Sequence, residues 1–526
     1  MDRSSAGKNK VDNGANGAPG PDKGGPRDGG GQLAPQDPGR WMVLVVVSIA
    51  QLMIVLDISI VNIALPDAQK ALGFSNADRQ WIVTAYSLAF GALLLFGGRL
   101  ADQIGRKRMF VAGLCVFALA SFLGGISPNF TVLVIARAIQ GVAGATLAPA
   151  ALSLLTTTFP DTRERGKAFS VFGAVAGSGA AIGLLLGGVL TEYLSWRWTL
   201  FINVLFAAVA LVGALRYLGH ERPHQKPGLD LPGTILVSVG LFCLVYGFSN
   251  ADRHPWSAPS TWGFIAVGGV LLLAFCARLA RTPDPLLPPR VVLDRDRGGS
   301  FLAMFLTGAG IFGVFLFLTF FLQTSLDYSP VLTGLAFMPL VIALTIAATV
   351  STTALLPRVG PKFLIGPGMV VSAVGMVWLT GIALDSTYAS DILGPLILVG
   401  LGLGFVFAPA LNTATYGVHA RDAGVASATA NTAQQVGGSI GTALLNSIAA
   451  TALASYLTAH AAGGASPSLV AAQAAVHSYQ VVFWICAGIF GVGGVICFLL
   501  IRIGKQEPNL EPEPEFEPDP SQPANV

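Results

Sequence analysis

The stretch FGGRLADQIGRKRMF, residues 96–110, places five charged side chains between two long apolar runs. Charged residues make up only 11% of the 526-residue chain, 53% of it is hydrophobic, and the mean hydropathy is +0.65. Soluble domains contain about 25% charged residues. A chain this poor in charge cannot form a soluble surface, so the composition predicts a protein embedded in a membrane. Residues 96–110 are then expected to form a loop between two membrane spans.

Apolar runs long enough to cross a bilayer, about 20 residues each, occur fourteen times. They lie near 41–64, 79–99, 108–126, 130–154, 166–191, 199–218, 231–249, 262–280, 300–322, 331–355, 363–382, 391–414, 424–450 and 479–503. The fold class is therefore all-α integral membrane, and the even number of spans places both termini on one side.

Lysine and arginine are distributed unevenly over the connections between these spans. With the N-terminus inside, the inner connections and the C-terminal stub contain 20 Lys and Arg residues, and the outer connections contain only Lys70, Arg79, Arg197 and Arg253. Positive residues stay on the cytoplasmic side of a membrane. Both termini are predicted to be cytoplasmic, in a multi-pass protein of the cell membrane.

The chain repeats itself weakly at a spacing near 260 residues. GSGAAIGLLL (177–186) matches QVGGSIGTAL (435–444), so that Gly179 corresponds to Gly437 and Gly183 to Gly441. Repeated halves around a central site are the usual plan of secondary transporters. The expected domains are a disordered tail (1–40), a six-helix bundle (41–218), two additional helices with a linker (219–299), a second six-helix bundle (300–503) and an acidic Pro-rich tail (504–526).

Enzymes, pumps driven by ATP and nucleic-acid binding proteins are not indicated. The net charge is only +3, the six histidines are expected in loops without metal-ligand spacing, and no Gly-x-x-x-x-Gly-Lys-Ser/Thr motif is present. The five cysteines fall inside apolar runs and indicate neither a disulfide framework nor a metal site. We expect no cofactor and no metal, and the energy for transport would come from an ion gradient.

Residues 98–107 of the charged loop follow the pattern Gly-x-Leu-Ala-Asp-x-x-Gly-Arg-Lys, which is matched by Gly98, Leu100, Ala101, Asp102, Gly105, Arg106 and Lys107. This pattern is a loop signature of the major facilitator superfamily, and the chain resembles a fourteen-span drug:proton antiporter of that superfamily. LDISIVNIALP (56–66), RAIQGVAGA (137–145) and SWRWTLFIN (195–203) resemble further motifs of the family. The resemblance implies two inverted-repeat six-helix bundles, a small-molecule substrate, protons as the coupling ion, contact with membrane lipid and a monomer. The high usage of Ala, Gly, Arg and Pro is typical of a high-GC bacterium.

The charged loop has two interpretations. Its Lys and Arg residues alone would fix the topology, but that role does not explain Asp102 or the neighbouring glycines. A carboxylate near a helix N-terminus is stabilised by the helix dipole. Asp102 is therefore expected to form, with Arg106 or Lys107, a latch that closes the cytoplasmic side.

Two ionisable residues are predicted deep in the membrane, and such residues are functional candidates by default. Asp57 and Arg137 both lie roughly 10–12 Å below the outer surface, at ~1.5 Å per helical residue. A carboxylate in a low dielectric favours its neutral form, and a nearby guanidinium favours the charged form. This balance suits proton coupling, which the resemblance also implies for an acid in span one and an Arg in span four. The alternative is a static ion pair. The other acids, including Asp230, are expected at solvated span ends.

The fifth span contains the antiporter signature with one departure. AAIGLLLGG (180–188) has the glycines but places Leu184 where the family has proline. The glycines expected to allow close helix packing are Gly179, Gly183, Gly187 and Gly188.

The candidate substrate cavity is defined only loosely by polar and aromatic residues of the spans. The candidates are Gln51, Asn62, Gln140, Phe312, Phe315, Gln323 and Asn412. The predicted function is proton-coupled export of small amphiphilic drugs or antibiotics by alternating access. The alternative is a dedicated exporter, or a proton symporter, of one endogenous metabolite such as a self-produced antibiotic.

Overall fold

The computed structural model describes residues 39–75, 78–159, 162–219, 230–250, 258–282, 285–287, 289–418, 420–460 and 466–502. Within these ranges fourteen helical segments are long and apolar enough to cross a membrane, as the sequence predicts. The predicted tails lie almost entirely outside the described residues.

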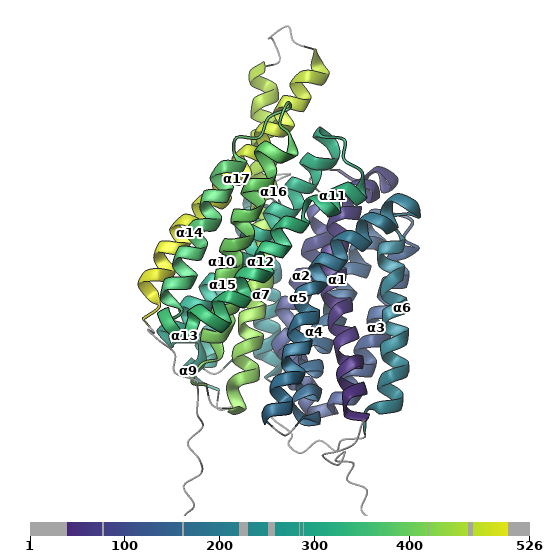
Figure 1. The fold of residues 1–526 in the computed structure, drawn as a ribbon, viewed down its shortest axis with the longest axis vertical. Coiled ribbons are helices and arrows are strands. Elements are labelled where there is room, and N and C mark those ends of the chain that lie inside the picture. The colour runs from purple at the N-terminus through teal and green to yellow at the C-terminus, as the bar shows by residue number, and fades with distance from the viewer. Residues whose placement is uncertain are drawn as a thin grey trace, which may run out of the picture.

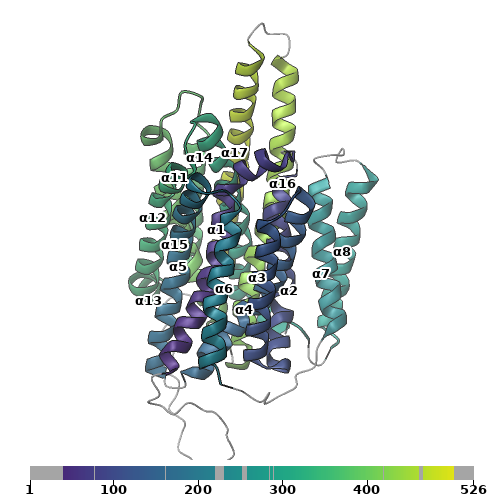
Figure 2. The same cartoon turned by 90° about the vertical axis from the view of Figure 1, so that its right-hand side faces the viewer.

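The first bundle contains six helices that run alternately up and down (Figures 1 and 2). They are α1 (Gly39–Leu72), α2 (Gln80–Ile104), α3 (Arg106–Gly125), α4 (Phe130–Thr158), α5 (Thr162–Tyr193) and α6 (Trp198–Tyr217). We call the end at which α1 begins the near end, and the end at which α1 finishes the far end. Inside the bundle, α3 packs against α4 and α6, and its large side chains Phe110 and Phe117 are fully buried.

The second bundle also contributes six spans, and several of them are broken. The first span is α10 (Arg295–Phe320), continued by the π-helical turn η1 (Phe321–Ser325). The second span is made of four pieces, α11 (Pro330–Ala336), α12 (Met338–Val350), η2 (Ser351–Leu355) and α13 (Leu356–Val359). The others are α14 (Lys362–Leu379), η3 (Tyr388–Ile392) with α15 (Leu393–Thr415), α16 (Ala420–His460) and α17 (Pro467–Leu500). A short helix, α9 (Pro289–Val292), precedes α10. Pro339 and Pro357 lie in the first turns of α12 and α13, because proline has no backbone N–H to continue the preceding helix.

The two additional spans, α7 (Leu231–Asn250) and α8 (Pro259–Leu279), lie at the side of the molecule as an antiparallel pair (Figure 2). Leu241 and Val245 of α7 pack against Leu88 of α2 and Val436 of α16. The pair therefore covers the seam where α2 of the first bundle meets α16 of the second.

The last two helices extend farther than the sequence predicts. The expected spans were 424–450 and 479–503, but α16 continues to His460 and α17 begins at Pro467, and this hairpin projects beyond the rest of the far end (Figure 1). The intervening sequence is rich in alanine, the best helix former, while its hydropathy is too low to mark a span. The expectation that His460 and His477 lie in loops was wrong; the other four histidines lie outside the described residues.

The two bundles are tied together at the far end. Gln323 Nε2, in η1, donates a hydrogen bond to the carbonyl of Ile63 in α1 at 3.1 Å. The backbone N–H of Val331 in α11 donates to the carboxylate of Glu192 in α5 at 3.0 Å. Both contacts join a helix of the first bundle to a helix of the second.

Backbone contact between α5 and α11 reinforces this closure. A Cβ on Gly188 of α5 would lie 2.7 Å from the carbonyl oxygen of Pro330, and a Cβ on Gly334 of α11 would lie 2.5 Å from the carbonyl oxygen of Leu184. Only glycine lets the two helices approach so closely. The far end is thus closed by backbone as well as by side chains.

Candidate functional site

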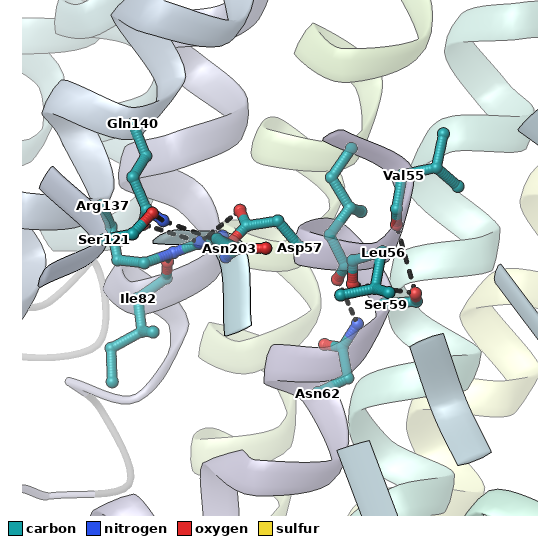
Figure 3. Close-up of polar contacts among 11 residues, drawn as sticks. Val55, Leu56, Asp57, Ser59, Asn62, Ile82, Ser121, Arg137, Gln140 and Asn203 are labelled. Carbon is teal, nitrogen blue, oxygen red and sulfur yellow. Dashed lines mark hydrogen bonds and ion pairs between the residues drawn. The ribbon is translucent and has the colours of Figure 1, made fainter. Parts of the chain in front are cut away.

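Asp57 and Arg137 form an ion pair inside the first bundle. Arg137 Nη1 on α4 lies 2.6 Å from Asp57 Oδ2 on α1, and the two side chains are 2% and 0% exposed (Figure 3). A charged pair removed from solvent in this way is costly unless further hydrogen bonds satisfy its remaining atoms.

Neutral polar side chains supply those hydrogen bonds. Asp57 Oδ1 accepts one from Gln140 Nε2 at 3.1 Å and one from Asn203 Nδ2, on α6, at 2.7 Å. Gln140 Nε2 also donates to Ser121 Oγ on α3 at 2.7 Å, and Gln140 Oε1 accepts from Arg137 Nη1 at 3.0 Å. Four helices thus contribute side chains to one buried network around the carboxylate, seen together in Figure 3.

Arg137 has partners besides Asp57. Its Nε donates to the carbonyl of Ile82 at 3.0 Å, and its guanidinium carbon lies 4.5 Å from the ring centroid of Tyr86; both residues belong to α2. A small cavity of about 10 Å³, close to the minimum for one water, adjoins Arg137 on the far-end side and is lined by Leu133, Trp196 and Thr199 among others. The guanidinium therefore stays stabilised if the charge on Asp57 changes.

Two of the predicted cavity residues do not face a cavity. Gln140 is fully buried in the ion-pair network, so it belongs with Asp57 and Arg137. Asn62 is 3% exposed and its amide donates to the carbonyl of Ile58 in its own helix at 3.1 Å, as Figure 3 shows. Helix geometry accounts for Asn62, because a short amide can bond to the carbonyl one turn back and a buried polar group needs such a partner.

The remaining cavity candidates have mixed environments. Phe312 is buried against α16, where a Cβ on Gly438 would lie 2.4 Å from its ring. Phe315 packs on Phe337, with ring centroids 5.0 Å apart. Gln323 belongs to the far-end closure described above, Gln51 is half-buried and Asn412 is exposed. The structure does not bring these residues together in one site.

The glycines of α5 lie along its contact with α1. A Cβ would meet Val55 at 3.0 Å if placed on Gly179, Ser59 Oγ at 2.0 Å on Gly183, and Ile60 at 2.8 Å on Gly187. Gly188, on the next face, contacts α11 instead. Leu184 is fully buried between these contacts, and α5 continues as a helix through it.

At the near end, the charged loop joins α2 to α3 through Gly105. This residue has φ +108°, a conformation that glycine adopts at little cost. Gly98 lies against Pro149 of α4, and a Cβ added to Gly98 would lie 3.5 Å from the proline ring.

The charged residues of the loop have different environments. Lys107 Nζ donates to the carbonyl of Leu218, at the C-terminal end of α6. Arg106 is half-buried, and the side chain of Asp102 lies outside the described residues, so the latch stays a prediction.

Asp230 departs from the expectation of a solvated helix end. It is 6% exposed, lies 2.8 Å from Arg278 Nε of α8, and accepts a hydrogen bond from the N–H of Gly233. Burial raises the pKa of the Asp230 carboxyl, but the hydrogen bonds from Arg278 and Gly233 outweigh it and leave the pKa lowered. The ion pair fastens α7 to α8 at the near end.

Sequence reasoning missed Asn203, Ser121 and Arg79. Asn203 is the last residue of SWRWTLFIN (195–203), which resembles a motif of the family. It is also an amide in an apolar run, and this pattern selected Asn62 and Gln51 as candidates. Arg79 was counted only as a positive charge outside the membrane, although it is 6% exposed. Its partners come from α10 and α16, more than 200 residues away, so no local pattern could reveal them.

Fourteen hydrophobic spans, twelve of them in two bundles of six, with a charge pair buried in the first bundle, define a multi-pass membrane transporter. Residues 47–442 match the family model described as Major Facilitator Superfamily. The chain belongs to this superfamily, and it is a transporter rather than an enzyme.

Curated relatives and solved structures agree with this assignment. The chain is 48% identical over 467 residues to a puromycin resistance protein of Streptomyces alboniger, covering 88% of this chain and 92% of the relative. It is 41% identical over 405 residues to a cephamycin export protein of Amycolatopsis lactamdurans, covering 76% and 83%. In fold it is similar to a bacterial homologue of the human lysosomal transporter Spinster, with a TM-score of 0.61 at 13% identity, covering 89% and 98%.

Proposed function

We propose that this protein exports an antibiotic-like small molecule in exchange for protons. The observation that carries the proposal is the Asp57 carboxylate, which is buried in the first bundle beside Arg137 and accepts three hydrogen bonds. An intramembrane carboxylate without access to solvent is costly to keep unless it functions or is fully paired.

The partners of Arg137 favour a coupling role over a static ion pair. If Asp57 takes up a proton, Arg137 keeps the carbonyl of Ile82, Gln140 Oε1 and the face of Tyr86. Breaking a buried ion pair usually costs about 3–5 kcal/mol, because one charge is left unpaired. The other partners of Arg137 offset part of this cost. The carboxylate can change its charge without disrupting the bundle.

Alternating access would work by rocking the two bundles about the site. The far-end contacts Gln323–Ile63 and Glu192–Val331 must break when the far end opens. The predicted near-end latch of Asp102 with Arg106 or Lys107 would form at that stage. Proton uptake at Asp57 and opening of the far end are then two events of one cycle.

The excess of Lys and Arg in the near-end connections supports a cytoplasmic near end. The protein would function in the bacterial cytoplasmic membrane with both termini inside, as a monomer in contact with lipid. The domain boundaries stay as the sequence predicts them.

The substrate class follows from the relatives. The chain is 48% identical to a puromycin resistance protein, and 33% identical over 412 residues to a tetracenomycin C resistance and export protein of Streptomyces glaucescens, covering 78% of this chain and 76% of the relative. Each of these names gives a single compound, and this favours a dedicated exporter of one antibiotic as the second candidate function. Puromycin is the first compound to test.

The test is puromycin export from cells that express wild type, Asp57→Asn or a control, each with and without a protonophore. Asp385→Asn is a suitable control, because it removes an exposed carboxylate at the far end. We expect export by wild type and the control, abolished by the protonophore, and no export by Asp57→Asn.

Export by Asp57→Asn that the protonophore still abolishes would make Asp57 structural. Export that the protonophore leaves unchanged would overturn proton coupling. A cationic dye and a panel of unrelated antibiotics, measured in the same cells, separate a multidrug exporter from a dedicated one.

A further inference from the structure

Asn203 holds an unusual position in the buried network. Its side chain is fully buried, and its Nδ2 donates to Asp57 Oδ1 at 2.7 Å, the shorter of the two hydrogen bonds to that oxygen. Its own amide oxygen, Oδ1, is buried and has no hydrogen-bond partner. Leaving a buried acceptor unpaired destabilises a protein, so the unpaired oxygen needs an explanation.

The carboxylate of Asp57 is satisfied only in its charged form. All three of its partners, Arg137, Gln140 and Asn203, present N–H groups to it. A protonated carboxyl has one O–H donor of its own and needs an acceptor. As the network stands, a neutral Asp57 would point its proton at another donor.

One of the three partners has an acceptor to offer. Arg137 has none. Gln140 is fixed on both sides, because its Oε1 accepts from Arg137 Nη1 and its Nε2 donates to both Asp57 and Ser121. The remaining acceptor is the unpartnered Oδ1 of Asn203.

We propose that Asn203 is a positioning residue that turns its side-chain amide when Asp57 becomes protonated. This inference rests on the proposed proton coupling at Asp57. In the charged state Nδ2 donates to Asp57; in the neutral state the amide has rotated and Oδ1 accepts the hydrogen bond from the Asp57 hydroxyl. The rotation gives the buried oxygen a partner and leaves one N–H without one. The change in the protonation of Asp57 therefore brings no net loss of hydrogen bonds at Asn203.

The proton balance of the step is simple. A hydronium ion breaks one of its O–H bonds and leaves as water, and its proton forms an O–H bond on Asp57 Oδ1. The carboxylate becomes neutral, no electrons are transferred, and no other covalent bond changes. Among the described residues, the charged or titratable groups that face Asp57 are Arg137 from α4 and Tyr86 from α2. The packed faces of α3 and α6 contribute the neutral Ser121 and Asn203. Asn203 is therefore the residue of α6 whose hydrogen bonding changes with the charge on Asp57 of α1.

The test is acid-induced infrared difference spectroscopy on the full-length protein in lipid, with asparagine labelled by ¹³C at the side-chain carbonyl. A residue that only donates a hydrogen bond keeps its amide carbonyl band unchanged. A residue whose carbonyl becomes an acceptor shifts this band to lower wavenumber. We expect such a shift with the same pH midpoint as the appearance of the Asp57 carboxyl band.

Variants assign the bands. Asp57→Asn should abolish both, whereas Asn203→Leu should abolish the amide shift and move the carboxyl band to higher wavenumber. Thr199→Val is the matched control, one turn away on α6. Its hydroxyl donates to the carbonyl of Trp196, just before the helix, and not to the Asp57 network; the variant should leave both bands in place. Asn203→Ser provides a smaller polar variant if Asn203→Leu fails to fold, and it too should remove the amide band.

The outcomes separate the two proposals. An Asp57 carboxyl band without any asparagine shift overturns the role of Asn203 and leaves proton coupling standing. An asparagine shift that persists in Asn203→Leu or Asn203→Ser also overturns it. The absence of an Asp57 carboxyl band over the whole pH range overturns proton coupling at Asp57, and the inference with it.

Discussion

The guanidinium carbon of Arg79 lies 4.1 Å from the ring centroid of Phe320, which joins the start of α2 to the end of α10. Phe317 lies beneath the same group at 5.4 Å, and Arg79 Nε donates to Asn446 Oδ1 of α16 at 3.4 Å. One buried cation of the first bundle is thus held by two helices of the second. Arg79 is placed to hold the far end closed.

Replacing Arg79 by leucine should open the far end. A desolvated cation–π contact is worth about 1–2 kcal/mol, so its loss should shift the closed-to-open ratio by about 5–30-fold. The measurement is the labelling rate of a cysteine at Ile63, in a cysteine-free background, by an impermeant maleimide added from the far side. Arg197→Leu is the control, because Arg197 packs on Trp196 within the first bundle. Equal labelling rates for Arg79→Leu and wild type would contradict the assignment.

Gly183→Ala should destabilise the contact between α1 and α5. Its Cβ would lie 2.0 Å from Ser59 Oγ, and overpacking of this kind costs about 1–3 kcal/mol. We expect a lower thermal stability in detergent, with partial recovery in the double variant Gly183→Ala, Ser59→Ala, which removes the clashing oxygen. Gly173→Ala, on the same helix but with open space at its Cβ, should match wild type. The absence of recovery would mean that the clash lies elsewhere.

Arg137→Lys should abolish most of the transport although it conserves the charge. A lysine ammonium is a point charge that cannot reproduce the separate bonds of the guanidinium to Asp57, Gln140 and the carbonyl of Ile82. We expect at least a tenfold loss of export at an unchanged amount of folded protein, measured in cells with puromycin. Wild-type export by this variant would show that charge alone suffices.

Asp230→Asn should loosen the pair α7–α8 in a way that depends on pH. Burial raises the pKa of the Asp230 carboxyl, but the hydrogen bonds from Arg278 and Gly233 leave it below the ordinary value of 3.8. Because the folded pKa is depressed, the stabilisation is complete above that ordinary value and is lost as the pH falls through the folded pKa. The difference in Tm between wild type and the variant should therefore be constant from neutral pH down to about pH 5 and should shrink below about pH 4. A difference that grows on acidification would contradict the ion pair.

The sequence by itself determined the class of protein, the number of spans and the two residues of the buried pair. Hydropathy over windows of about 20 residues is a local property, and so is the cost of placing Asp57 or Arg137 in a membrane. Hydropathy does not predict the alanine-rich ends of α16 and α17, because these segments are helical without being hydrophobic enough to be counted as membrane spans.

Only the tertiary structure decided which side chains meet. Gln140 of α4 and Asn62 of α1 carry the same amide group in apolar stretches of sequence, yet one completes the Asp57 network and the other bonds to its own helix. Asn203 reaches Asp57 from 146 residues away, and Arg79 reaches Asn446 across 367 residues. Such contacts depend on how helices rotate and tilt as they pack, which is set by the fit of all their side chains together and not by any single stretch of sequence.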